Sequence, residues 1–241
     1  MNSRRKFLVQ GSMATTALLA AKPFKAVADA SSPITGFGNN DNKVIFLHTS
    51  KPDNANHHQV MNHIAELKRS AGNIVLLNAG TAVAGNASSL NYDASISHAN
   101  AISATDYKII YKGNVKIGVI TATAGNNDLF SHVNTLASYL KKERNCHLVI
   151  CLSQLGYKQK NGIDDLNLAA RSSNLDIIIG GDVKNRSNNS MIALNKDKAE
   201  VIIDHAADAA LALGRIEITF NDRCQKRNIA FNDTPAGKLT A

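Results

Sequence analysis

The run from Leu175 to Asn185 constrains the fold of this chain more than any other segment. Its first half is almost continuously apolar, with isoleucine at positions 177–179, and it leads directly into Gly180 and Gly181. Such a run is typical of a strand buried on both faces, and paired glycines at its end allow a tight turn or a close approach. Because open α/β sheets bind ligands at the carboxyl ends of their strands, this segment predicts a binding site there.

Three other apolar segments also end in polar or glycine-containing residues, and we call the four ends the strand tips. The strand tips are Ser50–Asp53, Asn78–Thr81, Ser153–Gly156 and Gly180–Lys184. If the strands are neighbours, the tips meet at one face of the molecule and form a polar site. Ordinary polar loops between strands and helices give the same pattern, so both interpretations stay open on this evidence.

Periodicity along the chain predicts an α/β fold in which helices flank two sheets. Strands are expected at 44–48, 74–77, 107–111, 116–122, 147–152, 175–179, 191–194, 200–203, 214–220 and 228–231, and helices at 57–71, around 133–142 and at 164–172. The polar region 82–104 predicts a loop with a short helix around 92–94. The last four strands alternate like the antiparallel members of a second sheet.

The first 28 residues have the composition of an export signal. Arg4 and Arg5 precede a short, weakly apolar stretch that ends at small-residue cleavage patterns, and a membrane-spanning helix needs about 20 apolar residues. The block resembles a bacterial twin-arginine translocation signal, so we expect residues 1–30 to direct export to the periplasm or cell envelope, without stable membrane insertion after processing. Residues 31–42 are expected to form a flexible lead-in. The alternative is a basic amphipathic first helix of the mature fold.

The positive charge of the chain is concentrated in this leader. The formal net charge is +8, but five of the 27 basic residues lie in the first 28 positions, which hold no acidic residue. The remainder carries 22 basic and 19 acidic residues, and aromatic residues make up 5% of the chain. Neither a strongly basic surface nor a set of stacking side chains is evident, so we expect no nucleic-acid partner.

The three cysteines have no spacing typical of a zinc ribbon or a redox pair. Cys151 lies inside an apolar strand and is expected to be a small core residue. Cys146 and Cys151 lie too far apart along extended chain to bridge, whereas a disulfide that involves Cys224 stays open.

The strand tips resemble the metallophosphoesterase domain of the bacterial 5′-nucleotidase family, within the calcineurin-like superfamily. The segments that carry the resemblance are Phe46–Thr49, Leu76–Gly80, Cys151–Tyr157 and Asp176–Gly181, which occur in the family's order. The resemblance implies a four-layer αββα sandwich (α+β in composition), with two mixed β-sheets flanked by helices, over residues 43–231. A polar tail is expected at 232–241.

The resemblance also implies a two-metal site, but the ligand positions depart from the family pattern. Those positions fall on Lys51, Asp53, Thr81, Gln154, Asp182 and Lys184, and the family's Asn-His pair has only His98 as a weak catalytic counterpart. A lysine ammonium has no lone pair and repels a divalent cation, and a threonine hydroxyl cannot replace a bridging carboxylate. We therefore expect no cofactor, with Lys51 and Lys184 as anion-binding candidates. An active enzyme would require two divalent metals (Zn, Mn or Mg).

These observations predict an exported 5′-nucleotidase-like or metallophosphoesterase-like protein with weak or no phosphomonoester hydrolysis. One alternative is an active metal-dependent phosphatase or nucleotidase with an unusual site, and another is a non-enzymatic subunit that binds an anion or an envelope partner. The expected partners are a nucleotide or phosphate ligand and a separate chain carrying the nucleobase-binding domain that the family places downstream. The spacing of His57, His58 and His63 favours surface histidines over a metal site.

Overall fold

The structure, a computed structural model, describes most of the part of the chain that follows the leader. The described residues are 43–49, 57–80, 92–96, 107–125, 128–160, 163–181, 190–205 and 212–235, all within the unit that spans residues 33–241. In these ranges, no helix combines the length and the apolar character needed to cross a lipid bilayer.

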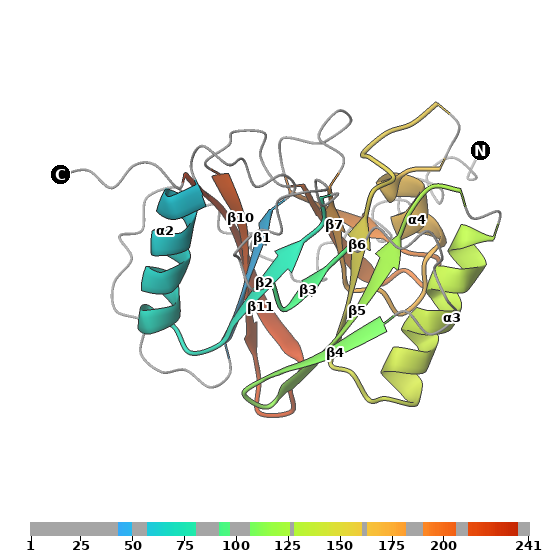
Figure 1. Cartoon of the computed structure of the whole chain (residues 1–241). Helices are drawn as coiled ribbons and strands as arrows, with labels where there is room; N and C mark the ends of the chain where they lie inside the picture. The colour runs from blue at the N-terminus through green and yellow to red at the C-terminus, as the bar shows by residue number, and fades with distance from the viewer. Residues whose placement is uncertain are drawn as a thin grey trace, which may run out of the picture. The chain divides into compact units, whose positions relative to one another are not determined.

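Strands outnumber helices in this part of the chain (Figure 1). The elements are, in order, β1 (Lys43–Thr49), α2 (His57–Ser70), β2 (Ile74–Asn78), β3 (Ala94–Ser95), β4 (Tyr107–Lys112), β5 (Val115–Ala122), α3 (Leu129–Lys142), β6 (Leu148–Ser153), α4 (Asp165–Arg171), β7 (Ile177–Gly180), β8 (Met191–Leu194), β9 (Glu200–His205), β10 (Ala212–Phe220) and β11 (Lys226–Pro235). Strands β4 and β5 form a hairpin, with Gly113 in the left-handed region (φ 56°) of its two-residue turn. Asp164 caps the amino end of α4, because its carboxylate accepts a hydrogen bond from the Asn167 N–H.

The strands form two mixed sheets. The five-stranded sheet has the order β11-β10-β1-β2-β3, and the six-stranded sheet has the order β4-β5-β6-β7-β9-β8. In the six-stranded sheet, β5, β6, β7 and β9 run parallel, so their carboxyl ends share one edge. In the five-stranded sheet, β1, β2 and β3 are parallel while β10 and β11 run antiparallel.

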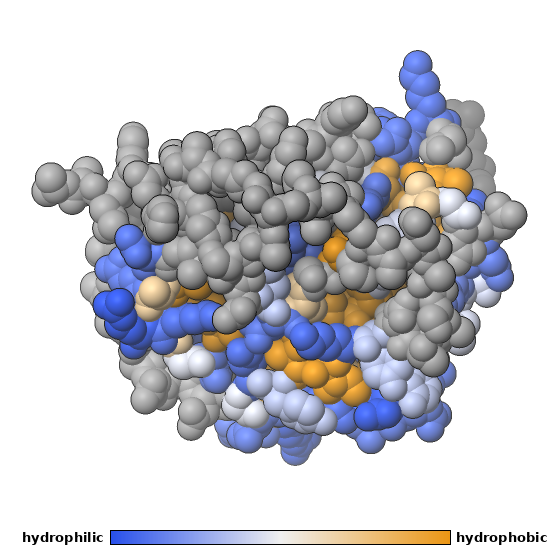
Figure 2. Space-filling view, in the orientation of Figure 1, coloured by the Kyte–Doolittle hydropathy of each residue, from blue (hydrophilic) through white to orange (hydrophobic). Residues whose placement is uncertain are grey.

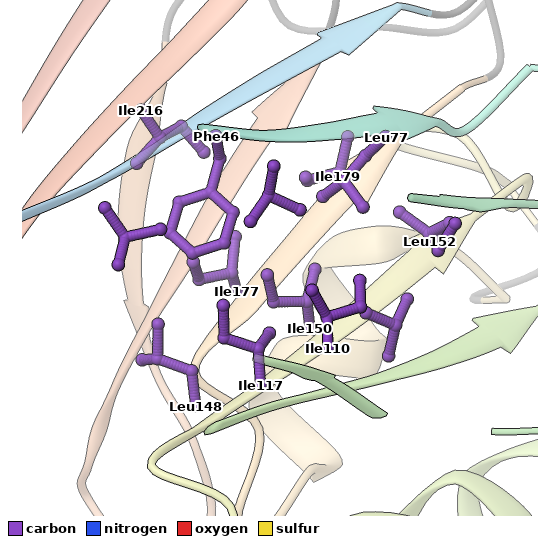
Figure 3. Packing of buried hydrophobic residues seen from close by; sticks show 14 of the residues in the cluster. Phe46, Leu77, Ile110, Ile117, Leu148, Ile150, Leu152, Ile177, Ile179 and Ile216 are labelled. Atoms are coloured by element: carbon purple, nitrogen blue, oxygen red, sulfur yellow. The ribbon is translucent and has the colours of Figure 1, made fainter. Parts of the chain in front are cut away.

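A hydrophobic core lies between the two sheets. Alternate residues of each strand point inward, and Figure 3 shows Phe46 of the five-stranded sheet facing Ile150 and Ile177 of the six-stranded sheet. These three side chains are fully buried. Burial of each such side chain contributes about 1.5–3 kcal/mol, so this shared core is the main contact between the sheets.

The outer faces of the sheets are covered by helices. Ile64 and Leu67 of α2 pack on the five-stranded sheet, whereas Val133 of α3 and Leu168 of α4 pack on the six-stranded sheet. The layers therefore follow the order helix, sheet, sheet, helix. This arrangement confirms the predicted αββα sandwich.

Two local predictions are wrong. The chain around 92–94 forms the start of strand β3 rather than a helix, because Leu77 and Asn78 pair with residues 94 and 95 and the Asp93 carboxylate accepts the Leu76 N–H at 2.8 Å. The last four strands do not make a sheet of their own: β8 and β9 join β7, while β10 and β11 join β1. Alternating polarity indicates a strand, but it does not say which strand will be its neighbour. β11 also runs to Pro235, into the expected tail.

One carboxylate connects several of these layers at the amino end of β7. Asp176 accepts a hydrogen bond from the backbone N–H of Val149 at 2.8 Å. Its two oxygens also lie 2.7 Å from the ammonium groups of Lys141, on α3, and Lys226, on β11. The Asp176 side chain is 10% exposed, so solvent screens these contacts only in part. Helix α3 and both sheets are thus tied to the same group.

We predict that Asp176→Asn lowers the free energy of unfolding by about 2 kcal/mol, because two lysines lose their shared counter-charge. Urea unfolding measures this change. Glu66→Gln, which neutralises an exposed carboxylate on α2, is the matched control and should change stability by less than about 0.5 kcal/mol. Equal effects of the two substitutions would show that the Asp176 contacts contribute nothing specific.

Candidate functional site

The structure brings the ends of β1, β2, β6 and β7 together at one edge of the sandwich. Within the five-stranded sheet, the Ala79 N–H donates to the Thr49 carbonyl at 3.0 Å, which joins the ends of β1 and β2. Within the six-stranded sheet, the Gly181 N–H donates to the Ser153 carbonyl at 2.7 Å, which joins β6 and β7. Gly181 also lies so close to the Ala79 carbonyl that a Cβ would overlap it. The ends of β1, β2, β6 and β7 therefore converge from both sheets, and Gly181 is glycine because another backbone passes there.

Most of the predicted site residues lie outside the described part of the chain. These are Lys51, Asp53, Thr81, His98, Asp182 and Lys184, together with the side chains of His57 and His58. Gln154 is described: it directly follows β6, and its backbone N–H donates to the Ala122 carbonyl at 2.9 Å. Its side-chain Nε2 is buried and has no hydrogen-bond partner among the described groups. A buried donor of this kind is stabilised when water or a ligand supplies an acceptor.

A buried imidazole–carboxylate pair connects the two sheets at the strand tips. His48 at the end of β1 and Asp204 at the end of β9 lie 3.0 Å apart from Nε2 to Oδ2, and both are at least 97% buried. The second carboxylate oxygen of Asp204 accepts hydrogen bonds from the Ser190 hydroxyl at 3.0 Å and the His205 N–H at 2.9 Å. Gly214 on β10 faces the His48 ring so closely that a Cβ would collide with it.

The surroundings of Asp204 lower the pKa of its carboxyl group. Burial acts to raise this pKa, but the charge of His48 and the hydrogen bonds from His48, Ser190 and the His205 N–H together outweigh burial. Asp204 is consequently ionised at neutral pH. It can then accept hydrogen bonds with both oxygens, as the geometry requires.

A second pair lies on the opposite face of β9, beneath α4. His205 Nε2 is 2.9 Å from Asp165 Oδ2, and the Ser153 hydroxyl donates to the other oxygen of Asp165. Gly180 leaves room for the His205 ring, because a Cβ there would overlap both the ring and the Asp165 carboxylate. The ring of Tyr157 meets the His205 ring edge-on at 5.9 Å between centroids. The ends of β6, β7 and β9 are thereby fixed to α4.

These two pairs were not identified as a site from the sequence. The signal that could have found them is the polar dipeptide Asp204-His205 at the end of an apolar strand, together with Gly180 and Gly214 inside strands. Glycine within a strand marks the close approach of another group. Here that group is a buried histidine in each case.

The hydrogen bonds of these groups hold the strand ends together. Ser153 is fully buried, and its hydroxyl donates a hydrogen bond to the Asp165 carboxylate, so it is not an exposed nucleophile. The Nδ1 atoms of His48 and His205 are buried as well, and they have no hydrogen-bond partner among the described groups.

Of the positions at which the resemblance places metal ligands, only Gln154 lies among the described residues. Across the ranges that the structure covers, no three or more His, Cys, Asp or Glu side chains are grouped to hold a metal ion. His48 and His205 already bond carboxylates through Nε2. Gln154, at one of the expected ligand positions, offers an amide in place of an imidazole. Divalent zinc or manganese favours histidine nitrogen and carboxylate oxygen over a neutral amide.

All three cysteines lie in the described part of the chain. Cys146, Cys151 and Cys224 are all free thiols. Cys151 is fully buried in the core on the α3 side, as expected, and burial raises the pKa of its thiol. The Cys224 sulfur lies 3.4 Å from the Asn114 carbonyl rather than beside another cysteine.

Comparison with solved structures identifies the fold. Residues covering 80% of the chain superpose on the 5′-nucleotidase precursor of Thermus thermophilus with a TM-score of 0.60 and 14% identity. The same share superposes on the NAD nucleotidase of Haemophilus influenzae with a TM-score of 0.55 and 14% identity. A putative 5′-nucleotidase from Staphylococcus aureus, solved with α-ketoglutarate, gives a TM-score of 0.50 at 11% identity over 79% of the chain.

The similarity to these three solved structures is a similarity of fold. They confirm the predicted metallophosphoesterase-like sandwich with two mixed sheets. The matched regions cover 54%, 50% and 53% of the three solved chains, so this chain spans about half the length of the structures it resembles. No family model and no curated protein matches the sequence.

We predict that Gly214→Ala destabilises the protein by about 1–3 kcal/mol, because the added methyl group overlaps the His48 ring. In a His48→Ala background that space is vacant, and the same substitution should be less destabilising by about 1 kcal/mol or more. Urea unfolding of the four proteins in this cycle measures the coupling. An identical effect of Gly214→Ala in both backgrounds would contradict the packing described here.

We predict an acid-dependent effect of Asp204→Asn. Because the folded-state pKa of Asp204 is lowered, its ionised form stabilises the fold above about pH 4, and this contribution is lost as the pH falls through the lowered pKa. The variant should be less stable than the wild type at neutral pH by about 2 kcal/mol. That difference should shrink in acid.

Urea unfolding at a series of pH values follows this difference. Glu200→Gln, which neutralises an exposed carboxylate on the same strand, is the matched control. The control should stay within about 0.5 kcal/mol of the wild type at neutral pH. If the difference in free energy of unfolding between the wild type and Asp204→Asn stayed constant down to the lowest pH measured, an ionised Asp204 would be contradicted.

Proposed function

We propose that this protein binds a phosphate-bearing ligand at its strand tips and hydrolyses phosphomonoesters weakly or not at all. The proposal rests on the hydrogen bonds that buried imidazoles and carboxylates at the strand ends make with one another. His48 bonds Asp204, and His205 bonds Asp165. These contacts hold the strand ends in place, and they occupy the Nε2 atom of each imidazole and both oxygens of each carboxylate.

The residue types at the tips support an anionic ligand. Lys51 and Lys184 stand in the sequence at positions where the resembled family places metal ligands, and a lysine ammonium binds phosphate as a point charge. Gln154 adds a buried amide donor without a partner among the described groups. Two lysines would repel a divalent cation at the same place. A phosphate group or a nucleotide is accordingly the ligand class that we propose.

A second candidate is an active, metal-dependent phosphatase or nucleotidase with an unusual site. It is favoured by one observation, that the solved chains with this fold include a 5′-nucleotidase precursor and an NAD nucleotidase. Asp53, Asp182 and His98 would be the residues to supply its oxygen and nitrogen ligands. This candidate requires a bound divalent metal and activity that a chelator abolishes.

The cellular setting is part of the proposal. Arg4 and Arg5 at the head of a short apolar stretch support export by the twin-arginine pathway to the periplasm or envelope. A separate chain that carries a nucleobase-binding domain stays a prediction, which co-purification from the native envelope would test.

We predict that purified protein stays at background rates with p-nitrophenyl phosphate and AMP, with or without added manganese. Inorganic phosphate should raise its melting temperature, because a ligand that binds only the folded state stabilises it by mass action. The stabilisation should reach a few degrees at saturating phosphate, since 1 kcal/mol shifts the melting temperature of a domain this size by about 2–4 °C.

Two variants localise that effect. Lys51→Ala together with Lys184→Ala should remove the phosphate-dependent shift, whereas Lys68→Ala on the exposed side of α2 should retain it. Manganese-dependent, chelator-sensitive hydrolysis would establish the second candidate instead. No response to phosphate or AMP in either assay would overturn both.

A further inference from the structure

A cluster of tyrosines lies on the outer side of the six-stranded sheet. Tyr107 and Tyr111 are on strand β4, Tyr139 is near the end of α3, and together they are three of the five tyrosines in the protein. The rings of Tyr107 and Tyr139 lie 5.7 Å apart. Tyr111 is 65% exposed and Tyr139 is 38% exposed. Large aromatic side chains left open to solvent in one place are typical of a protein-binding surface.

Two cationic side chains, Lys116 and Arg144, lie over these rings. We call the three tyrosines together with Lys116 and Arg144 the tyrosine cluster. Arg144 donates to the Tyr107 hydroxyl at 3.3 Å and to the Tyr139 hydroxyl at 3.5 Å. Its guanidinium carbon lies 6.0 Å from the centre of the Tyr107 ring, and the Lys116 ammonium lies 5.7 Å from the centre of the Tyr111 ring. These contacts hold the aromatic rings and the positive charges in one rigid group.

Strand β4 is positively charged along its length. The hairpin of residues 107–122 contains Lys108, Lys112 and Lys116 and no acidic residue. Lys112 pairs with Asp93 at 3.2 Å, whereas Lys108 is exposed. An acidic partner would therefore meet complementary charge along this strand.

β4 also forms an edge of its sheet. Within the described ranges it pairs with β5 alone, and it lies at the front in the view of Figure 1. Over this region, Figure 2 shows hydrophobic surface bordered by hydrophilic residues. The outer side of an edge strand carries backbone N–H and C=O groups that can pair with an added strand.

We propose that β4 and the tyrosine cluster form a docking surface for an extended acidic segment of a partner protein, which adds to the sheet as a strand beside β4. The backbone of β4 supplies the pairing and the tyrosines supply apolar contacts. Lys116 and Arg144 bind carboxylates on the tyrosine face, and Lys108 binds a carboxylate on the opposite face of the strand. A second copy of this chain is disfavoured as the occupant, because two β4 strands would bring like charges together. An acidic segment has no such penalty.

This surface is separate from the strand tips. Lys116 lies near the amino end of β5, and Arg144 precedes β6, whereas the tips follow the carboxyl ends of the parallel strands. Docking here consequently leaves the proposed phosphate site open. The two proposals can fail independently.

The test titrates the full-length protein with a short synthetic peptide of glutamates interrupted by valines, so that carboxylates lie on both faces of an added strand. The titration is done at low ionic strength and follows backbone amide signals by NMR. We expect the signals of 107–112 to shift, while signals around Ile64 on α2 do not. Lys108→Glu combined with Lys116→Glu should weaken binding about tenfold, as expected for the loss of two exposed ion pairs and the repulsion that replaces them.

A matched control carries the same charge change elsewhere: Lys68→Glu combined with Lys196→Glu, both exposed and far from β4 in the sequence. It should bind the peptide within about threefold of the wild type, since its effect is limited to long-range electrostatics that salt screens. Thermal unfolding checks that both double variants are folded.

Three results would overturn the proposal. They are no binding of the peptide, equal weakening by the two double variants, and shifts at 107–112 with phosphatidylglycerol vesicles but not with the peptide. The last result would assign the surface to an anionic membrane. A response to inorganic phosphate at the strand tips bears on the proposed function alone.

Discussion

The contact between His48 and Asp204 is the constraint on which the strand-tip end of the sandwich depends. It joins the next-to-last residues of β1 and β9 across the two sheets, in a place that solvent does not reach. A buried carboxylate is stable only when hydrogen bonds satisfy it, and here two further donors complete the set. Gly214 must then lack a side chain, because the His48 ring occupies that space. At the other end of the sandwich, Asp176 connects the sheets in a similar way through Lys226.

The sequence predicts the elements well where the local pattern decides them. The apolar spacing of α3 and the uninterrupted run of β6 both match the structure. Prediction fails where the structure of a segment depends on residues that are distant in the sequence. The short strand at 94–95 exists because β2 lies beside it, and β9 belongs to the six-stranded sheet because it pairs with β7. Neither neighbour can be seen in the local sequence.

The candidate site also combines features that the local sequence predicts with contacts that it does not predict. The glycine pair 180–181 indicates a strand end where something approaches closely, and the structure shows that His205 and the Ala79 carbonyl do so. The partnership of His48 with Asp204 spans 156 residues of sequence, so no local pattern could have predicted it. Residue types at the strand tips still carry information that the fold does not. At 14% identity the solved structures share the sandwich, whereas ligand chemistry depends on individual side chains.

The central claim is that positive side chains, and not metal ions, bind an anion at the strand tips. A crystal structure of the protein grown with manganese and phosphate tests it most directly, because anomalous scattering distinguishes a metal from a lysine nitrogen. The account predicts a phosphate ion beside Lys51, Lys184 and Gln154, with no anomalous peak next to it. Two anomalous peaks about 3.5–4 Å apart, bridged by that phosphate, would contradict the claim and identify a two-metal enzyme.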